Sequence, residues 1–200
     1  SITKVISTTS AVMKLVEKER IKLDDPVVKH LPQFKGKQSK YFDGKSKITI
    51  RNLLTHTGGL APFKQLFLME SDQKELLDSL YNIEPESGLE EKMIYSDIGI
   101  IILGKLVEKV SSVSLDSFVD SLIFNPLGMT STFYNPQSDK RHRIVPTEVS
   151  KIYRKGLIHN EVHDENAHSL GGVAGHAGLF STVRDLSKFF EVFKRSKSWR

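Results

Sequence analysis

The chain has 200 residues, of which 38% are apolar and 26% carry a charge. Domains average roughly 100–200 residues, so the length suits one domain, and the composition excludes a wholly disordered chain. Cysteine is absent, which excludes disulfides, thiol catalysis and cysteine-bound zinc or iron–sulfur sites. The longest apolar run, Ile100–Leu103, is too short to cross a membrane.

Lysine and arginine outnumber aspartate and glutamate by 29 to 24, which gives a net charge of +5. Much of the excess falls in one stretch that also contains glycine and serine: Lys35, Lys37, Lys40, Lys45 and Lys47. Nucleic-acid binders more often show a basic face interleaved with aromatic residues. We therefore expect a solvated loop over residues 35–47 and no nucleic-acid partner, with contact to an anionic polymer as the alternative.

The spacing of apolar and capping residues predicts a mainly helical chain. In chain order, helices are expected over residues 2–20, between Pro26 and Pro32, and over 49–56, 72–81, 98–110 and 115–124, with a last helix from Thr182 that carries Leu186, Phe189, Phe190 and Phe193. The expected N-caps are Thr49, Ser96 or Asp97, Ser114, and Thr182 in a capping box with Asp185. Turns are expected at Gly58–Gly59, Pro85–Gly88 and Asn125–Gly128.

The helix over residues 98–110 differs from the others because Ile98–Leu103 is apolar on nearly all sides. Such a helix is expected to be buried. Strand signals are few, and the candidates are Val145–Val149 and Lys151–Tyr153. Residues 133–175 otherwise show little periodicity, and long loops in a compact domain are usually either functional or disordered.

The chain opens with Ser1-Ile2-Thr3-Lys4, a Ser-x-x-Lys pattern at the expected start of a helix. Residues three apart share a helix face, so the Lys4 amine can reach the Ser1 hydroxyl. The positive end of the helix dipole favours a developing alkoxide and disfavours an ammonium. Both effects favour a nucleophilic Ser1 with Lys4 as its general base, although the pattern is common by chance.

Two further segments carry polar groups next to expected helix ends. Tyr95-Ser96-Asp97 precedes the buried helix, where Tyr95 can act as a second acid or base if a lysine lies nearby. The alternative is a tyrosine that packs at the helix start while Ser96 caps the helix. His56 precedes a Thr-Gly-Gly turn, and we interpret it as a cation favoured at a helix C-terminus that the glycines cap.

The segment from Val162 to Phe180 is dense in polar and small residues: His163, Asp164, Glu165, Asn166, His168 and the glycine-rich run Gly171–Gly178, which includes His176. His163 and His168 are five residues apart, whereas ligands on one helix face stand three or four apart, so no metal site is expected. Glycines allow close backbone approach. We therefore expect a structured glycine-rich loop near a cleft.

In this order and spacing, these segments resemble the penicillin-binding-protein-like serine hydrolases, a family that includes class C β-lactamases, DD-peptidases and related esterases. The matching segments are SITKVISTTSAVMKLVEKERIKLDDPVVKHLPQF, ITIRNLLTHTGGL, YSDIGIIILGKLVEKVSSVSLDSFVDSLIFNPLGM and LGGVAGHAGLFSTVRDLSKF. The resemblance covers about residues 1–135 and 160–195. The second part, together with IVPTEV and VHDENA, is most similar to bacterial β-lactamase-related domains.

The resemblance implies an α/β (α+β) fold of the β-lactamase/transpeptidase type and a two-step acyl transfer. It implies Ser1 as the acylated nucleophile, Lys4 as the general base and Tyr95 as the relay of the proton to and from the leaving group. His176 and Gly178 fit the letters of the family's third motif, His-x-Gly, and with Asp97 they are the expected substrate-binding residues. The resemblance implies no cofactor.

Position 97 departs from the family, because Asp97 stands where the family usually has asparagine. An asparagine amide both donates and accepts, whereas an ionised carboxylate only accepts. Asp97 is expected to pair with Lys4 and to weaken that lysine as a base. We therefore expect Asp97 to shift work to Tyr95 and to disfavour amide-bearing β-lactams.

The third motif is the larger departure. In the family it lies on a later sheet strand, whereas His176-Ala177-Gly178 precedes the LFST-x-x-DL helix. The family also has strands before the nucleophile and after the last expected helix. We therefore expect residues 1–200 to be a single incomplete domain, an internal piece of a domain nearer twice its size. Loss of the third-motif strand is expected to remove one oxyanion donor, which costs roughly 10²–10³ in rate.

Three functions follow from these residues. The first is a serine hydrolase that acts through an acyl-enzyme on a small-molecule or peptide acyl substrate, more like an esterase or DD-peptidase than a true β-lactamase. The second is a non-catalytic module that binds peptidoglycan or a peptide. The third is an N-terminal-nucleophile hydrolase that uses the Ser1 amine, but those enzymes begin with a strand and this chain begins with an expected helix. Family analogy places the protein in the bacterial cell envelope or outside the cell.

Overall fold

The computed structural model describes residues 2–35, 45–69 and 71–194, with side chains up to Val192. Ser1, Lys37, Lys40 and the Phe193 side chain lie outside this part of the chain. The helices are α1 (Ser10–Glu17), α2 (Val27–His30), α3 (Ile50–Leu54), α4 (Gln73–Tyr81), α5 (Asp97–Ser111), α6 (Leu115–Val119), α7 (Glu165–Ser169) and α8 (Val183–Lys194). Two π-helical segments join them, with Lys4–Thr9 leading into α1 and Asp120–Phe124 continuing α6. Short 3-10 helices cover Pro32–Lys35, Lys45–Lys47, Leu66–Leu68 and Ser138–Arg143.

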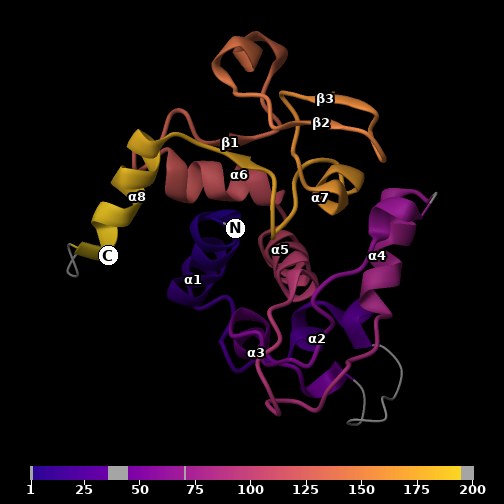
Figure 1. Ribbon diagram of the computed structural model, residues 1–200. Helices are drawn as coiled ribbons and strands as arrows, with labels where there is room; N and C mark the ends of the chain where they lie inside the picture. Colours follow the sequence, from indigo (N-terminus) through magenta and orange to yellow (C-terminus); the bar gives the residue numbers. More distant parts are fainter. Residues whose placement is uncertain (1, 36–44, 70, 195–200) are drawn as a thin grey trace.

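In the described residues, four short strands form two antiparallel pairs. β1 (Phe133–Tyr134) pairs with β4 (Leu179–Phe180), and Tyr134 lies opposite Leu179. β2 (Glu148–Ser150) pairs with β3 (Gly156–Ile158), and Val149 lies opposite Leu157. Both pairs lie at one end of the molecule and α2 and α3 at the other, with α5 between them (Figure 1).

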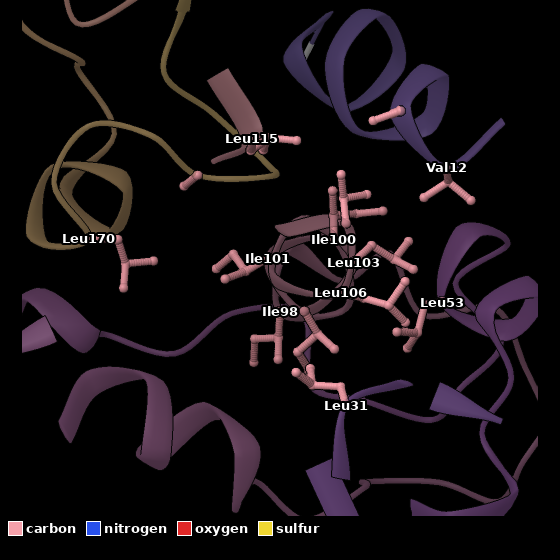
Figure 2. Close-up of a cluster of buried hydrophobic side chains, with 14 of the residues drawn as sticks. Val12, Leu31, Leu53, Ile98, Ile100, Ile101, Leu103, Leu106, Leu115 and Leu170 are labelled. Carbon is pink, nitrogen blue, oxygen red and sulfur yellow. The ribbon is translucent and has the colours of Figure 1, made fainter. Parts of the chain in front are cut away.

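Helix α5 is the centre of the hydrophobic core. All six residues from Ile98 to Leu103 are buried, as the all-round apolar pattern predicts. Side chains from other elements surround them in Figure 2, including Val12, Leu53, Leu115 and Leu170. Full burial of one large aliphatic side chain is worth about 1.5–3 kcal/mol, so α5 anchors the elements around it. None of the described helices combines the length and the apolarity that a membrane span requires.

The predicted helices are largely confirmed, and local chemistry sets their ends. The first helix stops at Glu17, because Glu19 adopts a left-handed φ of 54° that no helix continues. Thr49 and Asn52 form a reciprocal capping box at the start of α3. Ser114 precedes α6, but its hydroxyl bonds Ser117 Oγ instead of a backbone N–H.

The capping box at the start of α8 is half formed. Thr182 Oγ1 accepts the Asp185 N–H at 3.2 Å, as predicted. The Asp185 carboxylate turns away to accept the Ser131 N–H at 2.7 Å, so it ties α8 to the segment before β1. Phe189 of α8 is fully buried, whereas Phe190 is exposed by 44%.

The strand predictions are partly wrong. The predicted strand Lys151–Tyr153 is a bend, and Val145–Val149 shares only its last two residues with β2. The partner strand β3 carries no sequence signal, because the hairpin buries little. Val149, Ile152 and Leu157 are 65%, 88% and 52% exposed and only Ile158 of β3 is buried, so no continuous buried face imposes an alternating pattern.

The interpretation of residues 35–47 as a solvated loop is wrong at Lys45. This side chain is 1% exposed, donates from Nζ to the Tyr81 carbonyl at 2.5 Å, and lies 4.6 Å from the Phe34 ring centroid. Burial lowers the pKa of Lys45 to about 8, while the charge of Glu84 opposes the shift. Lys35 and Lys47 are exposed, as predicted.

The glycine-rich segment lies directly on the backbone of α5, which confirms the predicted close approach. A Cβ at Gly175 would lie 2.2 Å from the Ile100 carbonyl oxygen. From the other side, a Cβ at Gly104 would lie 3.1 Å from the Gly175 Cα. Neither position has room for a side chain, so the backbone around Gly175 packs directly on the backbone of α5. This contact holds the glycine-rich segment on the core.

We expect Gly175→Ala to lower the free energy of unfolding by about 3 kcal/mol, the upper range for overpacking, because the rigid α5 backbone cannot yield to the added methyl group. Urea denaturation measures the change. Gly156→Ala is the matched control, since no atom lies within 4 Å of its Cβ, and it should stay within about 1 kcal/mol of the wild type. Equal stability of the two variants would contradict the assigned contact.

Candidate active site

Lys4 is the buried centre of the candidate site. It lies in the first turn of the π-helical segment and is 7% exposed. Its Nζ is 2.7 Å from Asp97 Oδ1 at the start of α5, and it donates to the His176 carbonyl at 3.5 Å. Three segments distant in sequence therefore meet at one amine. Asp97 pairs with Lys4, as predicted.

Hydroxyl groups on the first helix fix the position of Lys4. Thr8 Oγ1 donates to the Gly175 carbonyl at 2.6 Å, and Thr3 Oγ1 accepts the Leu179 N–H at 3.4 Å. The Tyr134 hydroxyl donates to Ser7 Oγ at 2.8 Å. Burial raises the pKa of Tyr134 well above its usual range, so the hydroxyl stays a donor. These bonds explain why threonine and serine interrupt an otherwise apolar helix.

A second set of bonds fixes the segment that contains Tyr95. The Asp97 N–H donates to the Pro62 carbonyl at 2.9 Å, and Ser96 Oγ donates to the Ala61 carbonyl at 2.6 Å. The same Ser96 oxygen accepts the Gly99 N–H at 3.2 Å, which makes Ser96, and not Asp97, the N-cap of α5. Because Ser96 does the capping, the Asp97 carboxylate is left for Lys4.

Tyr95 lies beside Lys4 with its ring 53% exposed. The Lys4 Nζ is 5.0 Å from the centre of the Tyr95 ring, within cation–π range. The structure therefore brings Lys4 together with Tyr95 and Asp97, although Lys4 stands more than 90 residues before them in the sequence. Tyr95 presents the open side of the cluster, and Lys4 the buried side.

His56 also belongs to this cluster. The sequence alone did not place His56 in the site. Its ring centre is 4.6 Å from that of Tyr95, and its Nδ1 accepts the Ser96 N–H at 3.1 Å. Burial and the Lys4 charge lower the pKa of His56, while the charge of Asp97 opposes the shift. The interpretation as a helix-terminal cation overlooked these contacts, although His56 stands within one of the segments that resemble the family.

His176 is buried, and its side chain contacts Asp164 at the start of α7. The ring is 1% exposed, and Nε2 lies 2.9 Å from Asp164 Oδ1. Although burial alone would raise the pKa of Asp164, the bonds to His176 and to the Ala167 N–H lower it overall. Asp164 thus caps α7 and anchors the loop whose carbonyl faces Lys4. Direct contact between His176 and a substrate stays a prediction.

Gly178 lies in the wall of a cavity of about 310 Å³ that Asp164 also lines. Its φ of 118° suits glycine, and a Cβ there would lie 2.3 Å from the Gly172 carbonyl oxygen. The cavity is lined by Thr147, Glu161, Val162, His163, Asp164 and the segment from Ala177 to Phe180. A glycine-rich loop near a cleft is therefore confirmed.

The remaining histidines of this region face single carboxylates. His163 lies 3.4 Å from Glu148, and His168 lies 3.3 Å from Glu161. Within the described ranges, no three histidine, aspartate or glutamate side chains gather in a way that would hold a metal ion.

We expect Lys4→Met to lower the free energy of unfolding by about 2–3 kcal/mol, because it leaves the largely buried Asp97 carboxylate without its cation. The double variant Lys4→Met/Asp97→Asn should recover at least half of that loss, since it buries no unpaired charge. Lys14→Met is the control, because the Lys14–Glu17 pair is more exposed and should contribute under about 1 kcal/mol. A double variant no more stable than Lys4→Met would contradict this account.

Comparisons with known proteins agree with the geometry. A family model described as Beta-lactamase matches residues 1–199. A protein of Escherichia coli K12 that bears the provisional name D-alanyl-D-alanine carboxypeptidase is 34% identical over 212 residues, which cover 96% of this chain and 49% of that protein. The chain thus spans about half the length of the curated relatives it matches.

Solved structures show the same fold. The D-stereospecific amidohydrolase from Streptomyces sp. is 25% identical, with a TM-score of 0.70 and coverage of 96% of this chain and 58% of that one. The octameric penicillin-binding protein homologue from Pyrococcus abyssi is 24% identical, with a TM-score of 0.72 and coverage of 98% and 44%. The fold is thus the β-lactamase/transpeptidase-like α/β (α+β) type. This chain belongs to the β-lactamase family of serine hydrolases.

Proposed function

We propose that the protein hydrolyses an ester, amide or peptide through an acyl-enzyme on Ser1, and that residues 1–200 supply the nucleophile, the base and the proton relay. One observation carries this proposal: Lys4, which follows Ser1 by three residues, meets Tyr95 and Asp97 in a single cluster. A lysine, a tyrosine and a serine at this spacing suit general-base activation of a hydroxyl.

Each residue has a defined role in the proposed reaction. The amine form of Lys4 takes the Ser1 hydroxyl proton as Oγ bonds to the substrate carbonyl carbon. The Tyr95 hydroxyl passes a proton to the leaving oxygen or nitrogen as its bond to carbon breaks. Water then adds to the acyl-enzyme with the proton transfers reversed, and the free acid leaves. His176 supports Lys4 through its carbonyl, and Gly178 borders the cavity that would receive part of the substrate.

Asp97 shapes which substrates are favoured. Its carboxylate lies 2.7 Å from Lys4 Nζ and pairs with the amine that has to accept the serine proton. An ionised carboxylate also offers no N–H to a substrate carbonyl. The alcohol of an ester leaves more readily than the amine of an amide. A Lys4 that Asp97 holds in a pair therefore favours esters over β-lactams. Relatives bear the names D-alanyl-D-alanine carboxypeptidase and D-stereospecific amidohydrolase, which supports a peptide or related amide as a further substrate.

A second candidate is a non-catalytic module that binds peptidoglycan or a peptide in the same fold. The Lys4–Asp97 pair favours it, since a lysine held as an ammonium does not take a proton from serine. The cavity beside Gly178 would then serve binding alone. Location in the bacterial cell envelope or outside the cell fits either candidate.

Reaction with a fluorophosphonate probe tests the proposed hydrolase. We expect an adduct on Ser1, identified by intact mass and peptide mapping, because the probe reacts with activated serines. Lys4→Ala should slow the labelling by roughly 10²–10⁴, the usual contribution of general-base catalysis. Circular dichroism on the same samples separates lost activation from lost folding. A folded wild-type chain without an adduct would favour the binding module.

Asp97→Asn tests the effect of the carboxylate. We expect β-lactam acylation to rise by roughly tenfold relative to ester hydrolysis, because the amide adds a hydrogen-bond donor and no longer holds the ammonium form. The ratio of the two kcat/KM values, with a labelled penicillin and a chromogenic ester, measures the change. Glu17→Gln, which removes the exposed carboxylate beside Lys14, is the control. An unchanged ratio for Asp97→Asn would remove the assigned role.

A further inference from the structure

His56 has a backbone conformation that costs free energy. Its φ is 59°, in the left-handed region that residues other than glycine adopt at a cost, although asparagine, aspartate and histidine do so more often than the others. Two glycines follow at Gly58 and Gly59, yet neither occupies this position. A residue held in an unfavourable conformation must gain from its contacts, so the contacts of His56 indicate what it does.

His56 binds the residue before Tyr95 and the residue after it. The His56 carbonyl accepts the Ile94 N–H at 2.8 Å, and His56 Nδ1 accepts the Ser96 N–H at 3.1 Å. Between these two bonds, the imidazole ring packs on the Tyr95 ring with 4.6 Å between centres and 41° between planes. One residue therefore fixes the backbone before and after Tyr95 as well as the ring itself.

The bond to Ser96 also fixes the protonation state of His56. Nδ1 can accept an N–H only when it carries no proton, so the proton of the neutral ring lies on Nε2. An imidazolium would turn a donor toward the Ser96 N–H and would break this bond. Ser96 is 3% exposed, so water does not readily replace the lost acceptor.

We propose that neutral His56 is the positioning residue of the candidate site, which holds the Tyr95 hydroxyl in place for proton transfer and releases it when the ring is protonated. This inference rests on the proposed hydrolase function. The charged groups that face His56 are Lys4 on the first helix, which opposes protonation, and Asp97 on α5, which favours it. Burial also opposes protonation and lowers the pKa of His56, so the neutral ring predominates at pH 7.

Protonation of His56 should lower the activity. As the pH falls through the lowered pKa of His56, the imidazolium forms, the Ser96 bond breaks and Tyr95 loses its support. We therefore expect an acid loss of activity that belongs to His56 and does not require a change at Lys4 or Tyr95. A purely structural role for His56 would alter stability without a matching change in the pH profile of the reaction.

His56→Asn tests this inference, with the rate of Ser1 labelling by the fluorophosphonate measured from pH 5 to pH 9. Asparagine adopts the left-handed conformation readily, and its Oδ1 can replace Nδ1 as the acceptor, so the turn should be retained. Loss of the ring contact should slow labelling by roughly two- to tenfold at pH 8. The acid step of the wild-type profile should disappear, because the variant has no imidazole. His56→Phe, which keeps a ring but no acceptor, should also lack the step and should be slower throughout.

His142→Asn is the matched control, since His142 is exposed and lies outside the cluster, and it should keep the wild-type profile. If His56→Asn keeps both the wild-type rate and the acid step, the positioning role is wrong even though the hydrolase proposal stands. If the wild-type Ser1 is not labelled at any pH, the hydrolase proposal fails first and this inference fails with it. The ring nitrogen chemical shifts of His56 give a separate readout, because a proton on Nδ1 at pH 7 would overturn the assignment.

Discussion

A lysine ammonium cannot be buried without a partner, and this constraint organises the site. Lys4 is 7% exposed, so the first helix can pack on the core only where a carboxylate and a carbonyl meet its amine. Asp97 at the start of α5 and the His176 carbonyl meet that need. The same contacts that bury Lys4 also set where the first helix, α5 and the glycine-rich segment lie. The site and the fold around it therefore depend on each other.

The supporting contacts divide the site into a rigid side and an open side. On the rigid side, Gly175 touches the α5 backbone and His176 is held by Asp164, which also caps α7. On the open side, Tyr95 is half exposed and depends on His56 and the short segment around it. In the proposed reaction Tyr95 passes protons to a substrate and must be reachable, so its order has to come from its neighbours and not from burial.

The parts of the fold that local sequence determines were predictable. The Ile98–Leu103 part of α5 is apolar on nearly all sides because it is buried, and Thr49 caps α3 through a residue three positions away. Helix α7 has only five residues, too few to show a period, and it depends on Asp164 and distant contacts. Strand β3 carries no pattern because it buries only Ile158 of its three residues.

The same distinction explains which site residues were found. Lys4, Tyr95 and Asp97 stand in short motifs that keep their chemistry when seen alone, so the sequence indicated them. The role of His56 depends on Ser96, 40 positions away along the chain, and no local pattern encodes that bond. For Lys45 the prediction was wrong, because a stretch rich in lysine predicted a solvated loop. The Lys45 side chain is instead buried against Phe34, in a contact that forms only when the chain folds.

The balance of charge in the cluster connects these observations. Lys4 and Asp97 neutralise each other, so a neutral His56 adds no charge to a partly buried site, whereas an imidazolium would add an uncompensated one next to Lys4. Asparagine in place of Asp97 would remove the negative charge of this pair. In the proposed reaction, proton transfer through Tyr95 therefore depends on the neutral histidine that holds it.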